Sequence, residues 1–385
     1  MNILGVSAYY HDSAASIIVD GRIVAAAQEE RFTRKKHDAN LPVNAMQYCL
    51  AAAGLTADQL DAVCYYDNPF LTLDRWLKNC IDEGRNGEKL IEKSFQSLLT
   101  QKLWIHDTIG NALDGLGKKG KLLVCEHHIS HAASAFYPSP FQSAAIVTID
   151  GVGEWATTTI GSGSGSKLNI LKQINYPHSL GLLYSAITYF CGFKVNSGEY
   201  KLMGLAPYGE ARYYDTIMDK LIEVKDDGSY RLNMQYFAFA RDTVMTDDDF
   251  GGLFHGLRRH PESPITRREM DLAASIQKVT EEIMIRIART ARKITGETNM
   301  CLAGGVALNC VANGKLLREN IFDNIWIQPA AGDAGGSLGC ALYAYYSYFN
   351  NERVSGAGDA QKTSYLGPEY SAGKITKYLD NKKFP

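Results

Sequence analysis

The sequence has no apolar run long enough to cross a membrane and no closely spaced pair of cysteines. Its apolar stretches fall short of the roughly 18 residues that a membrane-spanning helix needs. The eight cysteines are scattered, and most lie in apolar segments that predict burial. The amino terminus enters a strand-like segment directly, without the basic and apolar parts of an export signal. We therefore expect a soluble protein of the reducing cytoplasm.

An excess of charge of one sign is also missing. The 40 Lys and Arg residues nearly cancel the 42 Asp and Glu residues, which leaves a formal net charge of −2. The longest basic run is Arg34–Lys36, so the sequence does not predict a nucleic-acid-binding surface. What is present is an apolar content of 45% in 385 residues, which is more than one hydrophobic core usually accommodates. We expect a globular protein of two lobes.

A unit of strand, loop, strand, turn and strand occurs twice. The predicted strands are Asn2–Ser7, Ile17–Val19 and Arg22–Ala27 in the first copy, and Ala144–Asp150, Thr157–Ile160 and Lys167–Ile174 in the second. Helical patterns and single strands follow both copies. This order is similar to that of the actin, sugar-kinase and heat-shock-chaperone superfamily, whose fold is RNase H-like. The predicted fold class is therefore α/β, a duplicated actin-like fold of two lobes with a central nucleotide cleft.

Changes in composition mark the expected limits of the lobes. We predict lobe I at residues 1–142 and lobe II at residues 143–350. Residues 351–364 are small and polar, which is typical of a linker. Residues 365–385 are too few to fold alone, and we interpret them as the beginning of a further domain.

Two histidines and one aspartate are the candidate metal ligands. His127 and His131 are four residues apart at the start of a helical pattern, so both imidazoles can point at one cation. The glycine-rich turn Ala331–Gly336 offers the Asp333 carboxylate and bare backbone N–H groups to a ligand. Two histidines and a carboxylate are typical of non-haem Fe(II), and zinc or manganese also fits them. The alternative is that the pair is exposed, or hydrogen-bonded in a core.

Short turns rich in glycine and small residues are candidate phosphate loops, because such turns let backbone N–H groups approach an anion. Ordinary turns are the alternative explanation for each of them. The residues that we expect to contact a nucleotide are Asp12, Ser13, Asp150, Gly151, Gly153, Gly304, Gly305, Asn309 and Gly332.

Two further segments carry charge near these loops. Lys36 lies in the charged run Glu29–Asp38, and its place beside the first loop makes it a candidate for neutralising a phosphate or an oxyanion. Ser197–Gly209 mixes charged residues with glycines and a proline in an apolar frame, which suits the wall of a cleft. A buried helix with an ion pair between Glu199 and Lys201 is the alternative.

Six blocks of sequence together carry a resemblance to a known family. They are Tyr10–Ala15, Glu29–Arg34, Glu126–Phe136, Lys201–Ala206, Gly304–Cys310 and the turn around Asp333. In this order, over residues 1–350, they resemble the O-carbamoyltransferases of the NodU/CmcH type, which include TobZ-like enzymes. The candidate metal lobe is also similar to that of the enzymes that make threonylcarbamoyladenosine in tRNA.

The resemblance implies an ATP-dependent reaction in two steps. Carbamoyl phosphate and ATP give carbamoyl-adenylate, and the carbamoyl group then passes to a hydroxyl of a small molecule, such as a natural product or a sugar. It also implies that His127, His131 and Asp333 hold Fe(II) near the phosphates. His11 and Lys36 match family positions near the reacting carbonyl, where a neutral His11 would act as general base.

The chain departs from the family at its end. Members carry a C-terminal domain similar to YrdC that forms the adenylate, whereas this sequence stops soon after Pro368. We expect another polypeptide, or the rest of a longer one, to supply that domain. The acceptor would be selected by loops between Gly209 and Glu269, and a homo-oligomer is left open. Two alternatives are a nucleotide-binding regulatory module without catalysis and an actin-like sugar kinase.

Overall fold

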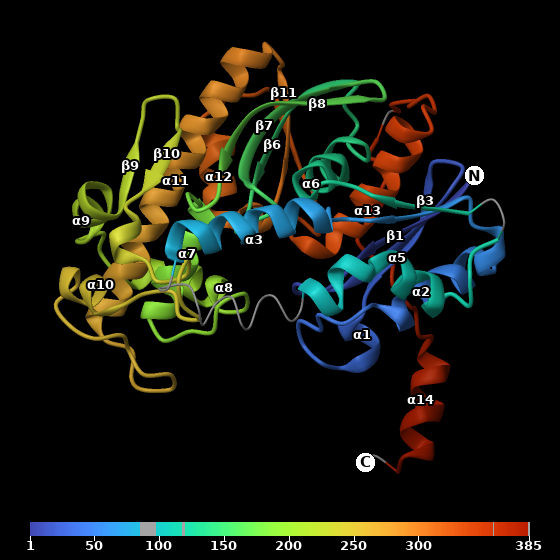
Figure 1. Cartoon of the computed structure of the whole chain (residues 1–385), viewed down its shortest axis with the longest axis horizontal. Coiled ribbons are helices and arrows are strands. Elements are labelled where there is room, and N and C mark those ends of the chain that lie inside the picture. The colour runs from blue at the N-terminus through green and yellow to red at the C-terminus, as the bar shows by residue number, and fades with distance from the viewer. Residues whose placement is uncertain (85–97, 118–119, 357, 384–385) are drawn as a thin grey trace.

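The computed structural model describes residues 1–84, 98–117, 120–356 and 358–383. Two five-stranded mixed sheets form its centre, one from each half of the chain (Figure 1). The first contains β1 (Asn2–Ser7), β2 (Ala14–Val19), β3 (Arg22–Gln28), β4 (Ala62–Tyr65) and β5 (Lys121–Val124). The second contains β6 (Ser143–Ile149), β7 (Ala156–Ser164), β8 (Lys167–Asn175), β11 (Asn299–Ala303) and β12 (Asn324–Ile327). A small hairpin is formed by β9 (Ile222–Val224) and β10 (Tyr230–Leu232).

The two sheets have the same topology. The strand order is β3-β2-β1-β4-β5 in the first and β8-β7-β6-β11-β12 in the second. In each sheet the first strand of the hairpin unit pairs antiparallel with the second strand and parallel with a later single strand. The predicted repeat is therefore confirmed, and with it the duplicated actin-like α/β fold.

The central strands form because their sequences are apolar on both faces. β1 is buried at every position after Asn2, and β6 at every position after Ser143. Such runs are expected of strands that are covered on both sides of a sheet. β8 has a mixed pattern of exposure instead, as an edge strand with one face in solvent.

Helices cover the sheets and connect them. Their bounds are α1 (Glu30–Thr33), α2 (Val43–Ala53), α3 (Pro69–Glu83), α5 (Ile105–Ala112), α6 (His127–Phe136), α7 (Leu180–Phe190), α8 (Glu199–Leu205), α9 (Tyr214–Thr216), α10 (Asp248–Leu253), α11 (Arg267–Thr295), α12 (Cys310–Arg318), α13 (Asp333–Tyr343) and α14 (Ala372–Asn381). α11 begins with a capping box, in which the N–H and the hydroxyl of Thr266 donate hydrogen bonds to the carboxylate of Glu269. Gly296, with φ 70°, caps its other end. Within the described residues, no helix is both long and apolar enough to span a membrane.

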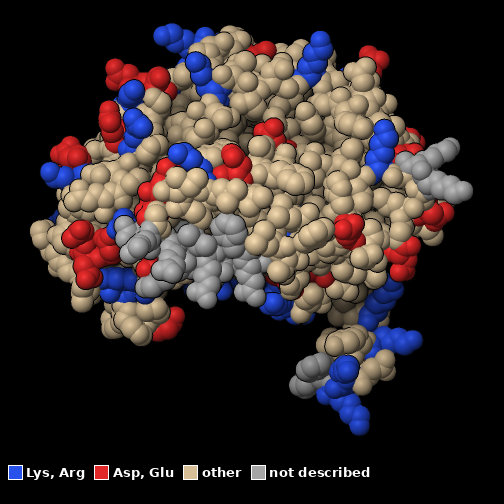
Figure 2. All heavy atoms as spheres, in the orientation of Figure 1, with Lys and Arg blue, Asp and Glu red and all other residues tan. Residues whose placement is uncertain are grey.

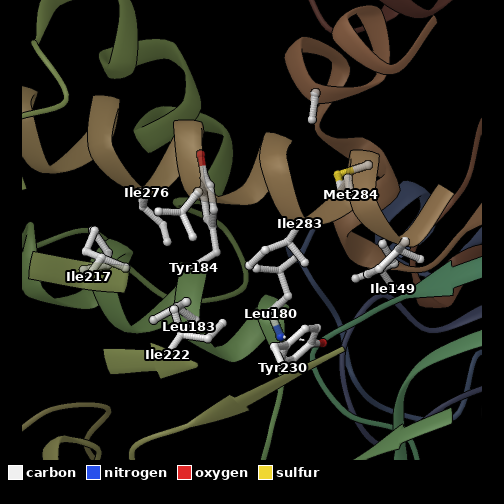
Figure 3. Packing of buried hydrophobic residues seen from close by; sticks show 14 of the residues in the cluster. Ile149, Leu180, Leu183, Tyr184, Ile217, Ile222, Tyr230, Ile276, Ile283 and Met284 are labelled. Atoms are coloured by element: carbon white, nitrogen blue, oxygen red, sulfur yellow. Dashed lines mark hydrogen bonds between the residues drawn. The ribbon is translucent and has the colours of Figure 1, made fainter. Parts of the chain in front are cut away.

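Packing of α7 on α11 forms the core of the second half (Figure 3). Tyr184 of α7 lies beside Ile276 of α11, and Leu180 of α7 lies beside Ile283 of α11. All four side chains are buried. A second core surrounds β1 and the helices that flank it. This second core also contains buried residues of α6, α13 and the two central strands β6 and β11 of the second sheet, so it fills the space between the sheets.

The helices α6 and α13 cross between the sheets with almost no space between their backbones. A Cβ atom on Gly339 of α13 would lie 1.7 Å from the carbonyl oxygen of Ser130 in α6. A Cβ atom on Gly5 of β1 would lie 1.8 Å from the carbonyl oxygen of Ser337 in α13. α13 thus packs on the first sheet although it comes from the end of the chain, while α6 packs on the second.

The tail after the second half is attached to the body. Arg353 is buried, and its guanidinium donates hydrogen bonds to the carbonyls of Phe136, Tyr137, Ser139 and Phe141. The carbonyl of Leu366 accepts a hydrogen bond from the N–H of Ala26 in β3, with N···O 3.1 Å. Beyond it, α14 projects from the body (Figure 1). The predicted limits of lobes, linker and further domain stay predictions.

Charge is mixed over the face shown in Figure 2. Acidic and basic side chains are interspersed there, as the small net charge of −2 leads one to expect. Basic side chains gather on the projecting α14, at the lower right of the view.

We predict that Gly339→Ala destabilises the protein, whereas Gly314→Ala does not. The added methyl group at residue 339 meets the Ser130 carbonyl, and such overpacking typically costs about 1–3 kcal/mol. At Gly314, in the interior of α12, a Cβ atom meets only the end of Arg318 at 3.5 Å, and alanine should stabilise the helix by about 0.5–1 kcal/mol. Chemical denaturation of both variants measures the difference. Equal midpoints would contradict the tight crossing of α6 and α13.

Candidate metal and nucleotide site

The starts of α6 and α13 meet at the end of β6. This meeting brings four buried side chains together, with ligand atoms that all lie within 4.8 Å of one another. They are His127, His131, Asp150 and Asp333. The positive ends of two helix dipoles thus point toward the same place.

Two imidazole nitrogens and two carboxylate oxygens face one point in this cluster. The Nε2 atoms of His127 and His131 are 3.0 Å apart. They lie 2.9 and 3.4 Å from Oδ2 of Asp150. Each also lies 3.7 Å from Oδ1 of Asp333. The structure therefore brings the three predicted ligands together, and it adds Asp150 to them.

The ionisation of these groups reflects their mutual contact. Burial would raise the pKa of Asp150, but its hydrogen bonds with His127 and His131 hold the pKa well below its usual range. Burial favours the neutral form of His127, but the carboxylates of Asp333 and Asp150 outweigh burial and raise the pKa of His127 to about 9. At neutral pH a proton therefore occupies the position that a cation would take.

The donor set fits a divalent metal ion. Oδ1 of Asp333, which lies 3.7 Å from the Nε2 atoms of both histidines, is buried and has no hydrogen-bond partner among the described residues. A buried polar atom without a partner is costly, unless a water or an ion satisfies it. Nitrogen and carboxylate oxygen donors suit iron, manganese and zinc alike.

Sequence reasoning placed Asp150 in a phosphate loop and did not place it beside the histidines. Its Oδ1 accepts a hydrogen bond from the N–H of Gly305, with N···O 2.8 Å, which leaves Oδ2 toward the two imidazoles. The signal in the sequence was an aspartate directly after a buried strand. That Asp150 contacts His127 becomes visible only in the structure, where the end of β6 lies beside the start of α6.

Two residues next to the cluster support it without joining it. His128 points away, and its Nδ1 lies 2.6 Å from Oγ1 of Thr148. The buried carboxylate of Glu154 accepts hydrogen bonds from the N–H groups of His127 and Asn68, with N···O 2.9 and 2.7 Å. Burial and the nearby Asp67 raise the pKa of Glu154 to about 7.

A cavity of about 260 Å³ opens beside the cluster, between the two halves of the chain. The predicted site residues that line it are His11, Asp12, Asp150, Gly151, Gly305, Asn309 and Gly332. Glu199, Tyr200 and Met203 of α8 form part of its wall, as expected for the segment Ser197–Gly209. Glu199 accepts hydrogen bonds from Oγ of Ser185 and from backbone N–H groups, while Lys201 is exposed.

The other predicted nucleotide contacts, Ser13, Gly153 and Gly304, are not among the residues that line the cavity. Ser13 is buried. A Cβ atom on Gly153 would lie about 3 Å from the rings of His127 and His128. Gly304 has φ 93°, where a side chain would also press on the Ile149 backbone. These residues shape the loops.

Asn309 is engaged within the protein. Its Oδ1 accepts a hydrogen bond from the N–H of Ala312 and so caps α12, with N···O 3.0 Å. Its amide also exchanges two hydrogen bonds with that of Gln277. Both polar atoms of its side chain are thus already hydrogen-bonded, and the predicted contact of Asn309 with a nucleotide stays a prediction.

The two predicted catalytic residues lie at different depths. Nε2 of His11 is 3.8 Å from Oδ2 of Asp333. Burial would lower the pKa of His11, but Asp333 and Asp12 outweigh it and raise the pKa to about 9. Neutralising the Asp333 carboxylate would bring this pKa down and free the imidazole to accept a proton. Lys36 is exposed at the rim, with its ammonium 5.4 Å from the centre of the Tyr200 ring.

Comparison with known proteins identifies relatives of the whole chain. Residues 2–342 match the family described as Carbamoyltransferase N-terminus. An uncharacterised protein of Synechocystis is 54% identical over 98% of this chain and 62% of its own length. Nodulation protein NolNO of Sinorhizobium fredii is 36% identical over 96% of this chain and 51% of its own length. The chain thus spans only about half to three-fifths of these relatives.

Among solved structures, HypF of T. kodakarensis is similar, with a TM-score of 0.46 and 15% identity over 91% of this chain and 48% of HypF.

We predict that the cluster binds Mn²⁺ in competition with protons. Because His127 must lose its proton to bind a cation, the affinity should rise from about pH 6 to about pH 9, by up to about tenfold per pH unit for one displaced proton. Calorimetry in buffers of different ionisation enthalpy measures both the affinity and the proton release. His131→Ala should abolish binding, and the exposed His106→Ala should not. Binding that is independent of pH, or retained in His131→Ala, would refute the assignment.

Proposed function

Because this chain belongs to the carbamoyltransferase family, whose N-terminal part it matches over residues 2–342, we propose that it carries the transfer site of an ATP-dependent O-carbamoyltransferase. The observation that supports this most is the buried cluster of two histidines and two aspartates beside a cavity. The cluster offers a place for a metal ion next to a space of the size that a small ligand needs.

The proposed reaction moves a carbamoyl group from carbamoyl-adenylate to a hydroxyl oxygen. A new bond forms between that oxygen and the carbamoyl carbon, while the bond from this carbon to the phosphate oxygen breaks. AMP leaves with the electron pair, and the hydroxyl proton passes to a base. Carbamoyl phosphate and ATP supply the adenylate, and a natural product or sugar is the proposed class of acceptor.

His127, His131 and Asp333, together with Asp150, would hold Fe(II) or another divalent metal. When bound, the metal supplies positive charge for phosphate oxygens and for negative charge that develops in the transition state. The protein's own contribution is the placement of its donors. The starts of α6 and α13 add N–H groups and positive dipole ends on the same side of the cavity, which favours an anionic ligand.

His11 and Lys36 have the proposed catalytic roles. The Nε2 atom of His11 faces the cluster, so a hydroxyl bound between them can pass its proton to the neutral imidazole. Such general-base catalysis is typically worth about 10²- to 10⁴-fold in rate. Lys36 lies at the rim, from where its long side chain can neutralise a phosphate or carbonyl oxygen at the mouth of the cavity.

The formation of carbamoyl-adenylate is assigned to a partner. The chain spans only part of the length of its relatives, so a YrdC-like domain in another chain, or in the remainder of a longer one, would complete the reaction. The transfer step is what we assign to the residues described here.

We predict that the chain, supplied with Fe(II) and carbamoyl-adenylate, carbamoylates at least one member of a panel of hydroxylated sugars and aminoglycosides. Asp333→Asn keeps the shape of the side chain but removes its charge, and it should lower transfer and bound metal together by about 10²-fold or more. Mass spectrometry of the acceptor measures the product, and His106→Ala is the matched control.

Three results would contradict this proposal, each in a different way. Transfer that is unchanged in Asp333→Asn would remove the cluster from the mechanism. A phosphorylated acceptor made from ATP would identify a sugar kinase. Nucleotide binding without any modified acceptor would favour a regulatory module.

A further inference from the structure

The carboxylate of Asp12 is held between two imidazoles at the cavity wall. Its Oδ2 lies 2.8 Å from Nδ1 of His11, and its Oδ1 lies 2.7 Å from Nδ1 of His37. Both oxygens are therefore engaged, one by each ring. The sequence alone predicts a phosphate-loop role for Asp12. In the charged run Glu29–Asp38 it points to Lys36 and gives no role to His37.

The backbone is bent to make this contact. Asp12 has φ 53° and His37 has φ 55°, in the left-handed region that non-glycine residues seldom adopt. The N–H of His37 donates to Oε2 of Glu30, with N···O 2.8 Å, which fixes the turn that presents the ring. Conformations of this kind persist only where surrounding contacts impose them, and they are enriched at functional sites.

The hydrogen bonds determine which ring nitrogens carry protons. A carboxylate only accepts hydrogen bonds, so Nδ1 of both His11 and His37 must be the protonated nitrogen. In the neutral His11 ring, Nε2 is then a bare acceptor, and it is the atom that faces Asp333 at 3.8 Å. A carboxylate that fixes the tautomer of a basic histidine in this way is a known device of hydrolases.

We propose that Asp12 and His37 are positioning residues for His11: Asp12 holds His11 in the tautomer that leaves Nε2 free, and His37 holds Asp12 in place. The proposal rests on the function proposed above, because it takes His11 as the proton acceptor. In the transfer step the hydroxyl proton passes to Nε2 of His11, and Asp12 keeps its negative charge and stabilises the resulting imidazolium.

A cation bound by this group is the competing explanation. Asp12, Glu30 and His37 offer ligand atoms that lie within 4.8 Å of one another. The two short hydrogen bonds of Asp12 already engage both of its oxygens, and all three side chains are only partly buried. The positioning role accounts for the contacts without a further ligand.

Two substitutions at residue 37 separate the hydrogen bond from the backbone turn. Glycine and asparagine both tolerate a positive φ, so neither should disturb the turn. His37→Gly removes the donor to Asp12, whereas the amide nitrogen of His37→Asn can take the place of Nδ1. The exposed His106→Asn is the control for loss of a histidine elsewhere.

The first measurement is transfer from carbamoyl-adenylate to the acceptor panel. We expect His37→Gly to lower kcat by about 10- to 100-fold with KM unchanged, which is the usual effect of losing a group that orients a functional histidine. We expect His37→Asn to recover most of the rate. An equal loss in both variants would overturn the proposal, because only the backbone or the ring's bulk would then matter.

The second measurement does not depend on activity. Ring ¹⁵N spectra of histidine-labelled protein are recorded at about pH 10, above the raised pKa of His11 of about 9, so that the ring is neutral and its tautomer can be read. The His11 signal is assigned by its loss in His11→Gln. The Nδ1–H tautomer should dominate in the wild-type chain and in His37→Asn, and it should become mixed in His37→Gly. An unchanged tautomer in His37→Gly would overturn the proposal.

The two measurements keep this inference distinct from the proposed function. If the wild-type chain transfers no carbamoyl group, the proposed function fails, while the ring spectra still decide whether His37 and Asp12 set the tautomer. If calorimetry with Zn²⁺ shows a second equivalent that His37→Gly abolishes, the group binds a cation and the positioning role is wrong.

Discussion

The close crossing of α6 and α13 determines where every other part of the site lies. These helices come from distant parts of the chain, and the absent side chain of Gly339 lets their backbones touch. Because each helix also packs on the sheet of the other half, the crossing joins the halves into one structure. Its result is that His127 and Asp333, at the two helix starts, face each other. A site assembled in this way exists only when both sheets have folded.

The electrostatics of the cluster follow from that geometry. Two aspartates share a small buried volume, which is unfavourable unless positive charge is near. The positive dipole ends at the starts of α6 and α13 provide part of this positive charge. The carboxylates also raise the pKa of His127, so that its imidazole binds a proton and becomes positively charged. The same arrangement extends outward through His11 to Asp12 and His37. The cavity wall is thus a connected series of charged and hydrogen-bonded groups.

Features that depend on spacing along the chain were predictable, whereas those that depend on contacts between elements were not. The repeated hairpin unit follows from its alternation and turns, and the shared face of His127 and His131 follows from helical periodicity. The place of Asp150 among the candidate ligands required the approach of β6 to α6. His37 was hidden in a run of charge, because its partner Asp12 lies in another loop.

One carboxylate joins the beginnings of two helices. Glu154 receives the N–H of Asn68, which precedes α3, and that of His127, which begins α6, while it belongs to the loop after β6. α3 lies across the front of both halves (Figure 1). A displacement of α3 relative to the second sheet would therefore pull on the same side chain that anchors His127. Glu154 thus ties the start of α3 and the backbone of His127 to one buried carboxylate, so the positions of the two helix starts depend on each other.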